Sequence, residues 1–375
     1  MSVTIEPVSD SQGREVFLDF AERCYEADSP RVTPLRAQDR WRLRPGAPFF
    51  RHADLVLLLA RRDGGVCGTI SVMLDRTHNE LKQEAVAFFG FFECDGEADT
   101  VAALMGAARE QARAWGCETL RGPRNLSRIE ETGLLVEGFD TRSPMLTGHH
   151  PPHYRGLIEA EGFEKHHDVL AYEIALRDED GDLRPLPRKL AQQADSVDVD
   201  GLVVRSIGWH RVLADLRLAH AVFVDAFRDV PENTPMSLRQ FTGVGLGFLA
   251  ATNRHMLQLA TVHGKPAGFA LCFPELHGAI VHAHGRLGPS GLIGLAGGLR
   301  TMDTASFKLL GVLPMYRGAG LHALLIREAI YGVARAGYQR LEASLIDERN
   351  APMRSIVEGA GMEIYKRFRI YEQAI

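Results

Sequence analysis

The chain repeats itself, and this repeat constrains the fold more than any other feature of the sequence. Residues 57–70 (LLLARRDGGVCGTI) align with residues 257–270 (LQLATVHGKPAGFA) at an offset of 200. Near the ends of the two halves, residues 162–173 align with residues 361–372 at an offset of 199. A length of 375 residues agrees with two domains of ordinary size. We therefore expect two diverged copies of one α/β unit.

The boundary between the copies follows from composition. Residues 177–200 are polar and contain proline, which is typical of a linker. We predict an N-terminal domain over 1–176, this linker, and a C-terminal domain over 201–375. Each copy follows the order helix, hairpin, strand, helix, strand, helix, strand, which predicts an α/β (α+β) fold with mixed central sheets flanked by helices.

The elements of both halves can be placed from their apolar periodicity. In the N-terminal half we predict a hairpin over 57–70 and a strand over 86–94. In the C-terminal half we predict helices over 210–228, 318–336 and 350–359. The strands predicted there are 255–262, 267–273, 306–312, 339–347 and 362–372.

Composition and charge exclude several classes of protein. A formal net charge of −5 gives no basic surface for nucleic acid. Five cysteines without any C-x-x-C pair argue against a disulfide framework and against a zinc site. The N-terminus lacks the pattern of a signal peptide, and no apolar run approaches the ~20 residues of a membrane-spanning helix. We therefore expect a cytoplasmic protein with no metal and no integral membrane segment.

Residues 311–330 (GVLPMYRGAGLHALLIREAI) carry the clearest chemical motif. Pro314 ends a hydrophobic strand, and the run from Arg317 to Gly320 opens a long amphipathic helix. Glycines let backbone N–H groups approach a diphosphate, and the helix N-terminus adds partial positive charge. Arg317 can add a charge-assisted contact. The segment lacks both the Walker pattern and the dinucleotide pattern, so it predicts an anion-binding loop of another kind.

This loop resembles the pyrophosphate loop of the GCN5-related N-acetyltransferase (GNAT) superfamily, whose pattern is Q/R-x-x-G-x-G/A. Arg317, Gly320 and His322 occupy its first, fourth and sixth positions. Asn350 opens the next helix, and Gly361 precedes the last strand, as in a GNAT unit. The resemblance implies two tandem GNAT-like acyl-CoA N-acyltransferase folds that span nearly the whole chain.

A narrower resemblance rests on three further segments. Residues 122–140, 149–163 and 369–372 are similar to a bacterial family with two GNAT domains. That family includes proteins proposed as N-acyltransferases of lipid bases in bacterial ceramide synthesis. The resemblance implies that the N-terminal copy shapes the acceptor side, through residues 122–125 and 134–140.

Two positions depart from the superfamily pattern. His322 replaces the usual Gly or Ala, and Val357 stands where many members have the tyrosine that protonates the leaving thiolate. The N-terminal copy departs further, because residues 95–100 (DGEADT) are acidic and contain no basic residue. Acidic residues at that position would repel a diphosphate, so only the C-terminal copy is expected to bind the co-substrate.

The resemblance also implies a set of binding residues for acyl-CoA or acetyl-CoA. Backbone N–H groups near Leu310 and Val312 would polarise the thioester carbonyl. The remaining positions are the loop and the following helix start: Arg317, Gly318, Ala319, Gly320, Leu321, His322 and Asn350.

An amine acceptor is mostly protonated at neutral pH, so a base is useful. Glu342 and Ser344 share one face of the strand over 339–347, and Glu348 follows at its end. The alternatives are that Glu342 is an ion-paired strand residue and that Glu348 or Asn350 caps the next helix. Glu275 is a further candidate base. 

Other candidates have both a chemical and a structural interpretation. Tyr371, the repeat partner of Tyr172, either supplies the missing acid or packs in the core. His282 and His284 alternate onto one face, without a third ligand for a metal. Residues 241–251 and 288–299 are apolar and rich in glycine. They form either core helices or a wall for a long acyl chain or for contact with a membrane.

Three functions remain open from the sequence. The leading hypothesis is an acyl-CoA-dependent N-acyltransferase in which an amine, possibly a long-chain base, attacks the thioester directly. The donor is carried by CoA or by an acyl carrier protein. The alternatives are an acetyl-CoA-dependent N-acetyltransferase of a small amine or amino acid, and a non-catalytic tandem GNAT protein that binds acyl-CoA.

Overall fold

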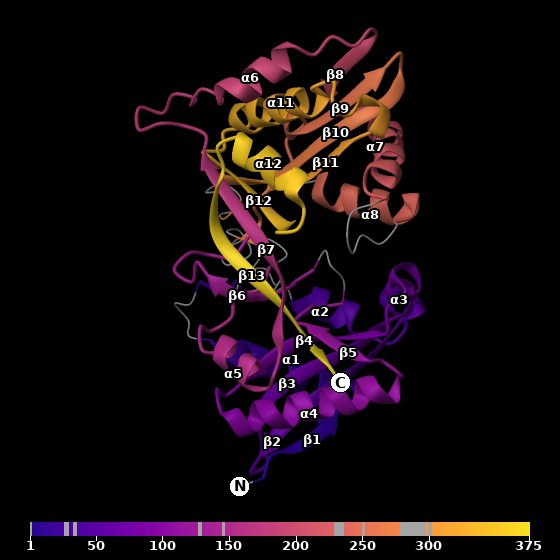
Figure 1. The fold of residues 1–375 in the computed structure, drawn as a ribbon, viewed down its shortest axis with the longest axis vertical. Helices are drawn as coiled ribbons and strands as arrows, with labels where there is room; N and C mark the ends of the chain where they lie inside the picture. The colour runs from indigo at the N-terminus through magenta and orange to yellow at the C-terminus, as the bar shows by residue number, and fades with distance from the viewer. Residues whose placement is uncertain are drawn as a thin grey trace. The chain divides into compact units, whose positions relative to one another are not determined.

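The computed structural model describes residues 2–25, 30–32, 36–126, 130–144, 147–228, 236–249, 252–277, 298 and 302–375. The chain forms two compact units (Figure 1). Unit 1 comprises Met1–Leu170, His277–Arg300 and Lys366–Ile375. Unit 2 comprises Ala171–Leu276 and Thr301–Tyr365. Each unit is a mixed sheet with helices on it, as the repeat predicted.

The sheet of unit 1 has the order β1-β2-β3-β4-β5-β13, and β6 also pairs with β13. Pairing is antiparallel from β1 to β4, parallel between β4 and β5, and antiparallel between β5 and β13. The strands are β1 (Thr4–Pro7), β2 (Ala53–Arg62), β3 (Gly65–Asp75), β4 (Val86–Cys94), β5 (Thr119–Gly122), β6 (Leu134–Glu137) and β13 (Glu363–Ala374). The helices are α1 (Ser11–Arg23), α2 (Arg36–Arg42), α3 (Arg76–Lys82), α4 (Ala98–Ala114) and α5 (Tyr154–Ala160).

The sheet of unit 2 has the order β8-β9-β10-β11-β12-β7, again with one parallel pair, between β11 and β12. The strands are β7 (Glu164–Ala175), β8 (Leu202–Ser206), β9 (Leu257–Val262), β10 (Lys265–Pro274), β11 (Thr304–Val312) and β12 (Arg340–Asp347). The helices are α6 (Arg188–Asp195), α7 (Val212–Ala226), α8 (Leu238–Leu249), α11 (Leu321–Arg335) and α12 (Ala351–Gly359). Every helix and strand predicted in the C-terminal half is confirmed to within a few residues.

The last strand of each copy is divided between the two units. The boundary between the units falls inside β7, after Leu170, and inside β13, after Tyr365. In unit 1, β13 pairs with β5 from Tyr371↔Gly122 to Ala374↔Thr119. In unit 2, β7 lies next to β12. The two repeats are contiguous along the chain, whereas each unit contains part of both β7 and β13.

The segment predicted as a plain linker contains a helix. Leu190 and Ala194, one turn apart on α6, are buried. These two residues are buried because α6 packs against α11, which lies beside it in Figure 1. The segment predicted as a linker over 177–200 thus includes α6, whose short apolar face lies among polar residues. Among the described residues, no helix combines the length and apolar character that crossing a bilayer requires.

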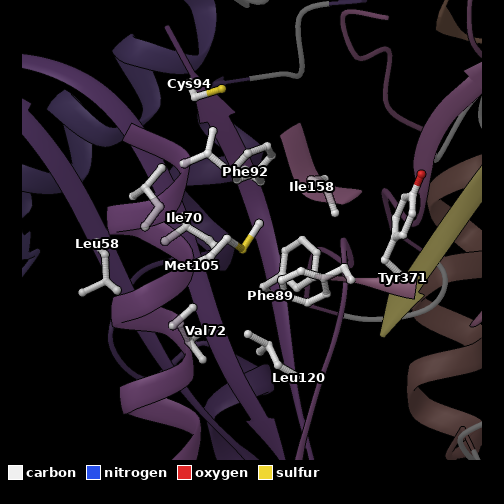
Figure 2. Packing of buried hydrophobic residues seen from close by; sticks show 14 of the residues in the cluster. Leu58, Ile70, Val72, Phe89, Phe92, Cys94, Met105, Leu120, Ile158 and Tyr371 are labelled. Atoms are coloured by element: carbon white, nitrogen blue, oxygen red, sulfur yellow. The ribbon is translucent and has the colours of Figure 1, made fainter. Parts of the chain in front are cut away.

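The core of unit 1 lies between the sheet and helices α4 and α5. Figure 2 shows Ile70 and Val72 of β3 facing Met105 of α4, with Phe89 of β4 beside them. Tyr371 reaches this core from β13, so a residue of the C-terminal repeat completes the core of the N-terminal unit.

One glycine in each copy lets the crossing helix approach the sheet closely. A Cβ atom on Gly68 would lie 2.8 Å from Leu104 Cδ1 of α4. A Cβ atom on Gly268, the repeat partner, would lie 2.9 Å from Leu325 Cδ1 of α11. The repeat therefore preserves a packing contact as well as the order of elements.

We predict that Gly68→Ala and Gly268→Ala each lower the free energy of unfolding by about 1–3 kcal/mol, because the methyl group overpacks the helix–sheet contact. Gly106→Ala in α4 is the control. A Cβ atom there meets nothing within 4 Å, so it should stabilise the helix by about 0.5–1 kcal/mol. Chemical denaturation measures all three, and unchanged stability of the first two variants would contradict the packing argument.

Candidate active site

The parallel ladder between β11 and β12 is short. It runs from Thr304↔Arg340 to Ser306↔Glu342, and the two strands then continue without pairing to each other. The strands therefore diverge beyond Ser306 and Glu342. Such a splay leaves room for a ligand between the carboxyl ends of two strands.

Four polar side chains meet where the strands part. Lys308 Nζ donates a hydrogen bond to Glu342 Oε1 at 2.9 Å and another to Ser344 Oγ at 2.7 Å. Ser306 Oγ also donates to Glu342 Oε1. Ser306 and Lys308 come from β11, and Glu342 and Ser344 from β12, so each strand contributes an alternating pair on one face.

A β-bulge brings Lys308 into this cluster. Leu271 of β10 pairs with Leu309, whereas Cys272 pairs with Phe307, so Lys308 is the extra residue on β11. Bulges bend a strand and change the direction of a side chain. The bulge therefore explains how a lysine in a largely apolar strand points at a buried carboxylate.

Glu342 is 1% exposed, and its Oε2 has no hydrogen-bond partner within the described part of the chain. Burial raises the pKa of Glu342, the Lys308 ammonium lowers it, and the charge of Glu275 raises it, with a result of about 7. A carboxyl with such a pKa is present in both protonation states at neutral pH, as a proton acceptor for an amine should be.

Tyr365 adds a proton donor that sequence reasoning missed. Burial raises the pKa of its hydroxyl well above the usual value, and the charges of Glu342 and Glu275 raise it further. The hydroxyl therefore stays protonated at neutral pH. Tyr365 lies in unit 2 with the polar cluster, and in this copy Val357 occupies the usual tyrosine position.

The predicted anion loop lies between β11 and α11. Gly318 and Gly320 both have positive φ, at 89° and 76°, and Gly320 caps the 15-residue helix. A Cβ atom on Gly318 would meet nothing within 4 Å, whereas one on Gly320 would lie 2.8 Å from Gln193 O of α6. Gly318 therefore faces open space, as a diphosphate cradle requires, and Gly320 is needed for the approach of α6.

Arg317 bridges two backbone carbonyls. Its Nε donates to Val312 O at 3.3 Å, and its Nη2 donates to Ala226 O at 3.1 Å at the end of α7. A guanidinium has five N–H donors, so others remain for a phosphate. Burial lowers the pKa of His322, which is therefore neutral at pH 7 and adds no charge to the loop. Leu310 and Val312 are buried on β11, while Ala319 and Leu321 continue the loop into α11.

The other candidates have partners of their own. Asn350 Oδ1 accepts a hydrogen bond from Met353 N at 3.2 Å, so Asn350 is confirmed as the N-cap of α12. Glu348 lies in the turn before that helix, where its carbonyl accepts from Arg354 Nη1 at 3.4 Å. Tyr371 lies in the core of unit 1, and its hydroxyl donates to Glu159 Oε1 at 3.0 Å. His282, His284 and all of 288–299 except Gly298 lie outside the described residues.

Sequence reasoning missed Ser306 and Lys308. Their signal was present, because two polar residues at i and i+2 interrupt the apolar strand SFKLLGV opposite the polar pair of RLEASLID. Among the described residues, no group of three His, Cys, Asp or Glu side chains is arranged to hold a metal ion.

The same position in unit 1 lacks this chemistry. The β4–β5 ladder ends at Phe88↔Arg121, as the β11–β12 ladder ends at Ser306↔Glu342. Counting two residues further along each strand places Gly90 at the position of Lys308 and Pro123 at the position of Ser344. The equivalents of the four polar residues are thus Phe88, Gly90, Arg121 and Pro123.

The segment after β5 also fills the splay of unit 1. Arg124 N donates to Phe89 O at 2.8 Å, and Phe91 N donates to Asn125 Oδ1 at 2.6 Å. A Cβ atom on Gly90 would lie only 2.1 Å from Arg124 O. In unit 1, the residues GPRN (122–125) therefore fill the space between the diverging strands. The corresponding segment of unit 2, after β12, leads into α12 instead.

Comparison with known proteins identifies full-length relatives, although no protein-family model matches the chain. The chain is 28% identical over 381 residues to the bacterial ceramide synthase of Caulobacter vibrioides. The alignment covers 100% of this chain and 98% of that protein. It is also 28% identical over 367 residues to protein YghO of Escherichia coli, over 96% of this chain and 93% of that protein.

Solved structures with the same fold also match along the whole chain. A tandem GNAT protein from the clavulanic acid biosynthesis pathway superposes with a TM-score of 0.55 at 17% identity, over 100% of this chain and 98% of that one. A GCN5-related N-acetyltransferase from Sphaerobacter thermophilus superposes with a TM-score of 0.53 at 14% identity, over 99% of this chain and 95% of that one. The tandem GNAT fold and the resemblance predicted from the sequence are therefore confirmed.

The loop geometry gives a matched test of CoA binding. We predict that Gly318→Asp weakens CoA binding at least about tenfold relative to Gly318→Asn, because only the aspartate places a negative charge in the cradle. Both variants strain the positive-φ position alike. Titration calorimetry with CoA measures the difference. Asp95→Asn in the turn after β4 should leave the affinity unchanged, and equal affinity of the two Gly318 variants would contradict the assignment of the loop.

Proposed function

We propose that this chain, an acyltransferase with two tandem GNAT folds, transfers a long-chain acyl group from a CoA thioester to an amine where β11 and β12 part. The observation that carries the proposal is the buried carboxyl of Glu342, whose Oε2 has no hydrogen-bond partner in the described part of the chain. Strand β11, which pairs with the strand of Glu342, leads directly into the anion loop. One unit thus combines a proton acceptor with a cradle for a diphosphate.

The chemistry follows from the ionisation of the amine. With an ammonium pKa of ~10.4, forming the neutral amine at pH 7 costs roughly 4–5 kcal/mol. Glu342 accepts that proton, and the nitrogen then attacks the thioester carbonyl. The C–N bond forms and the C–S bond breaks. The thiolate leaves with a proton, for which the Tyr365 hydroxyl is the donor in unit 2.

The developing negative charge on the carbonyl oxygen needs donors. We assign this role to backbone N–H groups near Leu310 and Val312 on β11, with the Lys308 ammonium adding positive charge beside them. Lys308 also holds Glu342 and Ser344 in place through its two hydrogen bonds. The sequence predicted four catalytic residues, Glu342, Ser344, Glu348 and Tyr371. In this proposal Glu342 keeps that role and Ser344 becomes a positioning residue, whereas Glu348 and Tyr371 have no part.

Two observations support lipid substrates. This protein is similar over its whole length to a protein named bacterial ceramide synthase, which suggests a lipid amine as the acceptor. Helix α8, in the apolar stretch predicted as an acyl wall, buries Phe241 but leaves Leu238 and Leu246 exposed. A dozen methylenes buried at ~0.8 kcal/mol each contribute ~10 kcal/mol, which an acetyl group does not offer.

A lipid acceptor also bears on where the protein works. We propose that the reaction takes place in the cytoplasm, with peripheral contact to the membrane that holds the acceptor. An acyl carrier protein is the alternative carrier of the donor. Acetyl transfer to a small amine and binding of acyl-CoA without catalysis are the competing functions, and the donor series below separates them.

We predict that Glu342→Gln lowers kcat/KM at least about 100-fold while CoA affinity is retained, because the amide cannot accept the proton. Only the ionised carboxyl acts as base, so the ratio of wild-type to variant kcat/KM should rise with pH through about 7 and level off above it. Taking the ratio removes the titration of the amine itself.

Glu348→Gln is the discriminating control for this prediction. If Glu342 is the base, Glu348→Gln keeps the wild-type rate and the wild-type pH profile. A variant series in which Glu348→Gln loses the rate and Glu342→Gln keeps it would move the base to the turn before α12.

Donor chain length tests the substrate class. We predict that palmitoyl-CoA is used with a kcat/KM at least about 100-fold higher than acetyl-CoA when the acceptor is a long-chain amine. Leu246→Asp on α8 should lower turnover of the long donor and spare acetyl-CoA, because a carboxylate beside methylenes is costly. Leu81→Asp on α3, also an exposed leucine, is the matched control. Acetyl-CoA used equally well would favour the acetyltransferase alternative, and no turnover of any donor would favour the binding protein.

A further inference from the structure

Helix α7 of unit 2 has an exposed side that mixes apolar and basic residues. Its buried side packs against β10 and β11, and α8 lies beside it (Figure 1). On the opposite side, Leu213, Arg217 and Val224 are exposed and lie along one line of the helix surface. Trp209, in the short helical turn that leads into α7, is 47% exposed. We call these four residues the α7 face.

The acidic residues of α7 do not neutralise this face. Asp215 is buried beneath the helix, where Arg205 pairs with it at 2.6 Å. Asp225, near the last turn, pairs with Arg228. Arg217 forms no ion pair with another described residue. The face therefore keeps a positive charge that is available to a partner.

A shallow hollow lies at the start of the same face, beside Trp209. Its volume is about 360 Å³, and its lining consists of Trp209, Thr252, Asn253, Arg254 and His255. Arg254 is exposed and forms no ion pair within the described ranges. None of the five lining residues is acidic. A guanidinium with amide and hydroxyl donors beside an indole ring suits a phosphate ester at the edge of an apolar phase.

The other exposed tryptophan has different surroundings. Trp41 on α2 is 49% exposed, much like Trp209. The arginines of α2, however, are each paired with an acid: Arg36 with Asp19, Arg40 with Glu15 and Arg42 with Asp39. Exposure of a tryptophan and unpaired arginines thus coincide at the α7 face and not on α2.

This combination favours a lipid surface over a protein or a nucleic acid. A stable protein interface depletes charge at its centre, whereas here Arg217 lies between Leu213 and Val224. A nucleic acid makes little use of exposed aliphatic side chains. At the surface of a bilayer, aliphatic and indole groups enter the boundary of the acyl chains while arginines reach the phosphates. The formal net charge of the chain is −5, so attraction to anionic lipid requires a local basic surface of this kind.

We propose that the α7 face, together with the hollow at Trp209, docks on a membrane that contains anionic phospholipids. Trp209, Leu213 and Val224 enter the boundary between headgroups and acyl chains, and Arg217 and Arg254 contact lipid phosphates. The surface lies wholly in unit 2.

The end of α7 also contacts the anion loop. Arg317 Nη2 donates to Ala226 O in the last turn of the helix at 3.1 Å. Docking through α7 therefore holds the loop near the bilayer in which long-chain donors and acceptors dissolve. This consequence rests on the proposed function, whereas the docking itself does not.

The test uses vesicles of phosphatidylcholine and phosphatidylglycerol in a ratio of about two to one, with the full chain and no acyl donor or acceptor. Co-sedimentation in about 0.1 M NaCl should show saturable binding. Binding should be at least about tenfold weaker in about 1 M NaCl or with phosphatidylcholine alone, because both remove the electrostatic attraction.

Variants locate the surface. Arg217→Gln combined with Arg254→Gln should weaken binding at least about tenfold, and so should Trp209→Ala. Trp41→Ala and Arg113→Gln, which change exposed residues of unit 1, are the matched controls and should bind as the wild type does. Thermal unfolding checks that every variant folds.

Tryptophan fluorescence adds a reading that a merely structural role would not give. Brominated phosphatidylcholine in the vesicles should quench the emission of the wild type and of Trp41→Phe, and Trp209→Phe should lose most of this quenching.

Several outcomes would overturn the proposal. They are no binding to anionic vesicles, wild-type binding by the folded double arginine variant, and quenching that persists in Trp209→Phe. A dimer in sedimentation velocity that Trp209→Ala dissociates would assign the face to a second copy of the chain instead. Glu342→Gln should bind vesicles as the wild type does, so failure here leaves the acyl-transfer chemistry untouched.

Discussion

The buried ion pair between Lys308 and Glu342 is the interaction on which the arrangement of unit 2 depends. An unpaired carboxylate in a protein interior costs several kcal/mol, and a nearby ammonium offsets much of that cost. The pair lies beside a bulge in β11, at the place where β11 and β12 stop pairing. The strand splay, the bulge and the charge pair therefore belong together. Removing one charge leaves the other buried without compensation.

Comparing the two units shows how one scaffold carries different side chains at the same position. Both have a parallel ladder of the same length that ends as the strands diverge. Unit 2 keeps the splay open and lines its start with polar side chains. Unit 1 fills the splay with Arg124 and Asn125, and its carboxylates lie further along β4, at Glu93. The repeat thus fixes the backbone, and a few side chains decide what each copy can bind.

Much of this could be predicted from the sequence, and the failures have physical reasons. The elements and the anion loop follow from local periodicity and from glycines that open α11, which are short-range signals. The division of β7 and β13 between the units is not local, because a repeat specifies which strands exist and not which core their residues complete. Tyr371 therefore lies in the core of unit 1 although it belongs to the C-terminal repeat. Lys308 was missed although its polar side chain interrupts an apolar strand, because its partner Glu342 lies 34 residues further along the chain.

The turn after β4 shows why only one copy is suited to a diphosphate. Arg62 of β2 donates to Asp95 at 2.6 Å and to Thr100 at 2.8 Å, and it also pairs with Asp99. Acidic side chains near a helix N-terminus satisfy its partial positive charge from within the protein. At the start of α11 in unit 2, the loop contains glycines and Arg317 instead, and the first turn has no acidic residue. The helix N-terminus of unit 1 is thus neutralised internally, whereas that of unit 2 keeps its positive potential, as the proposed binding of a diphosphate requires.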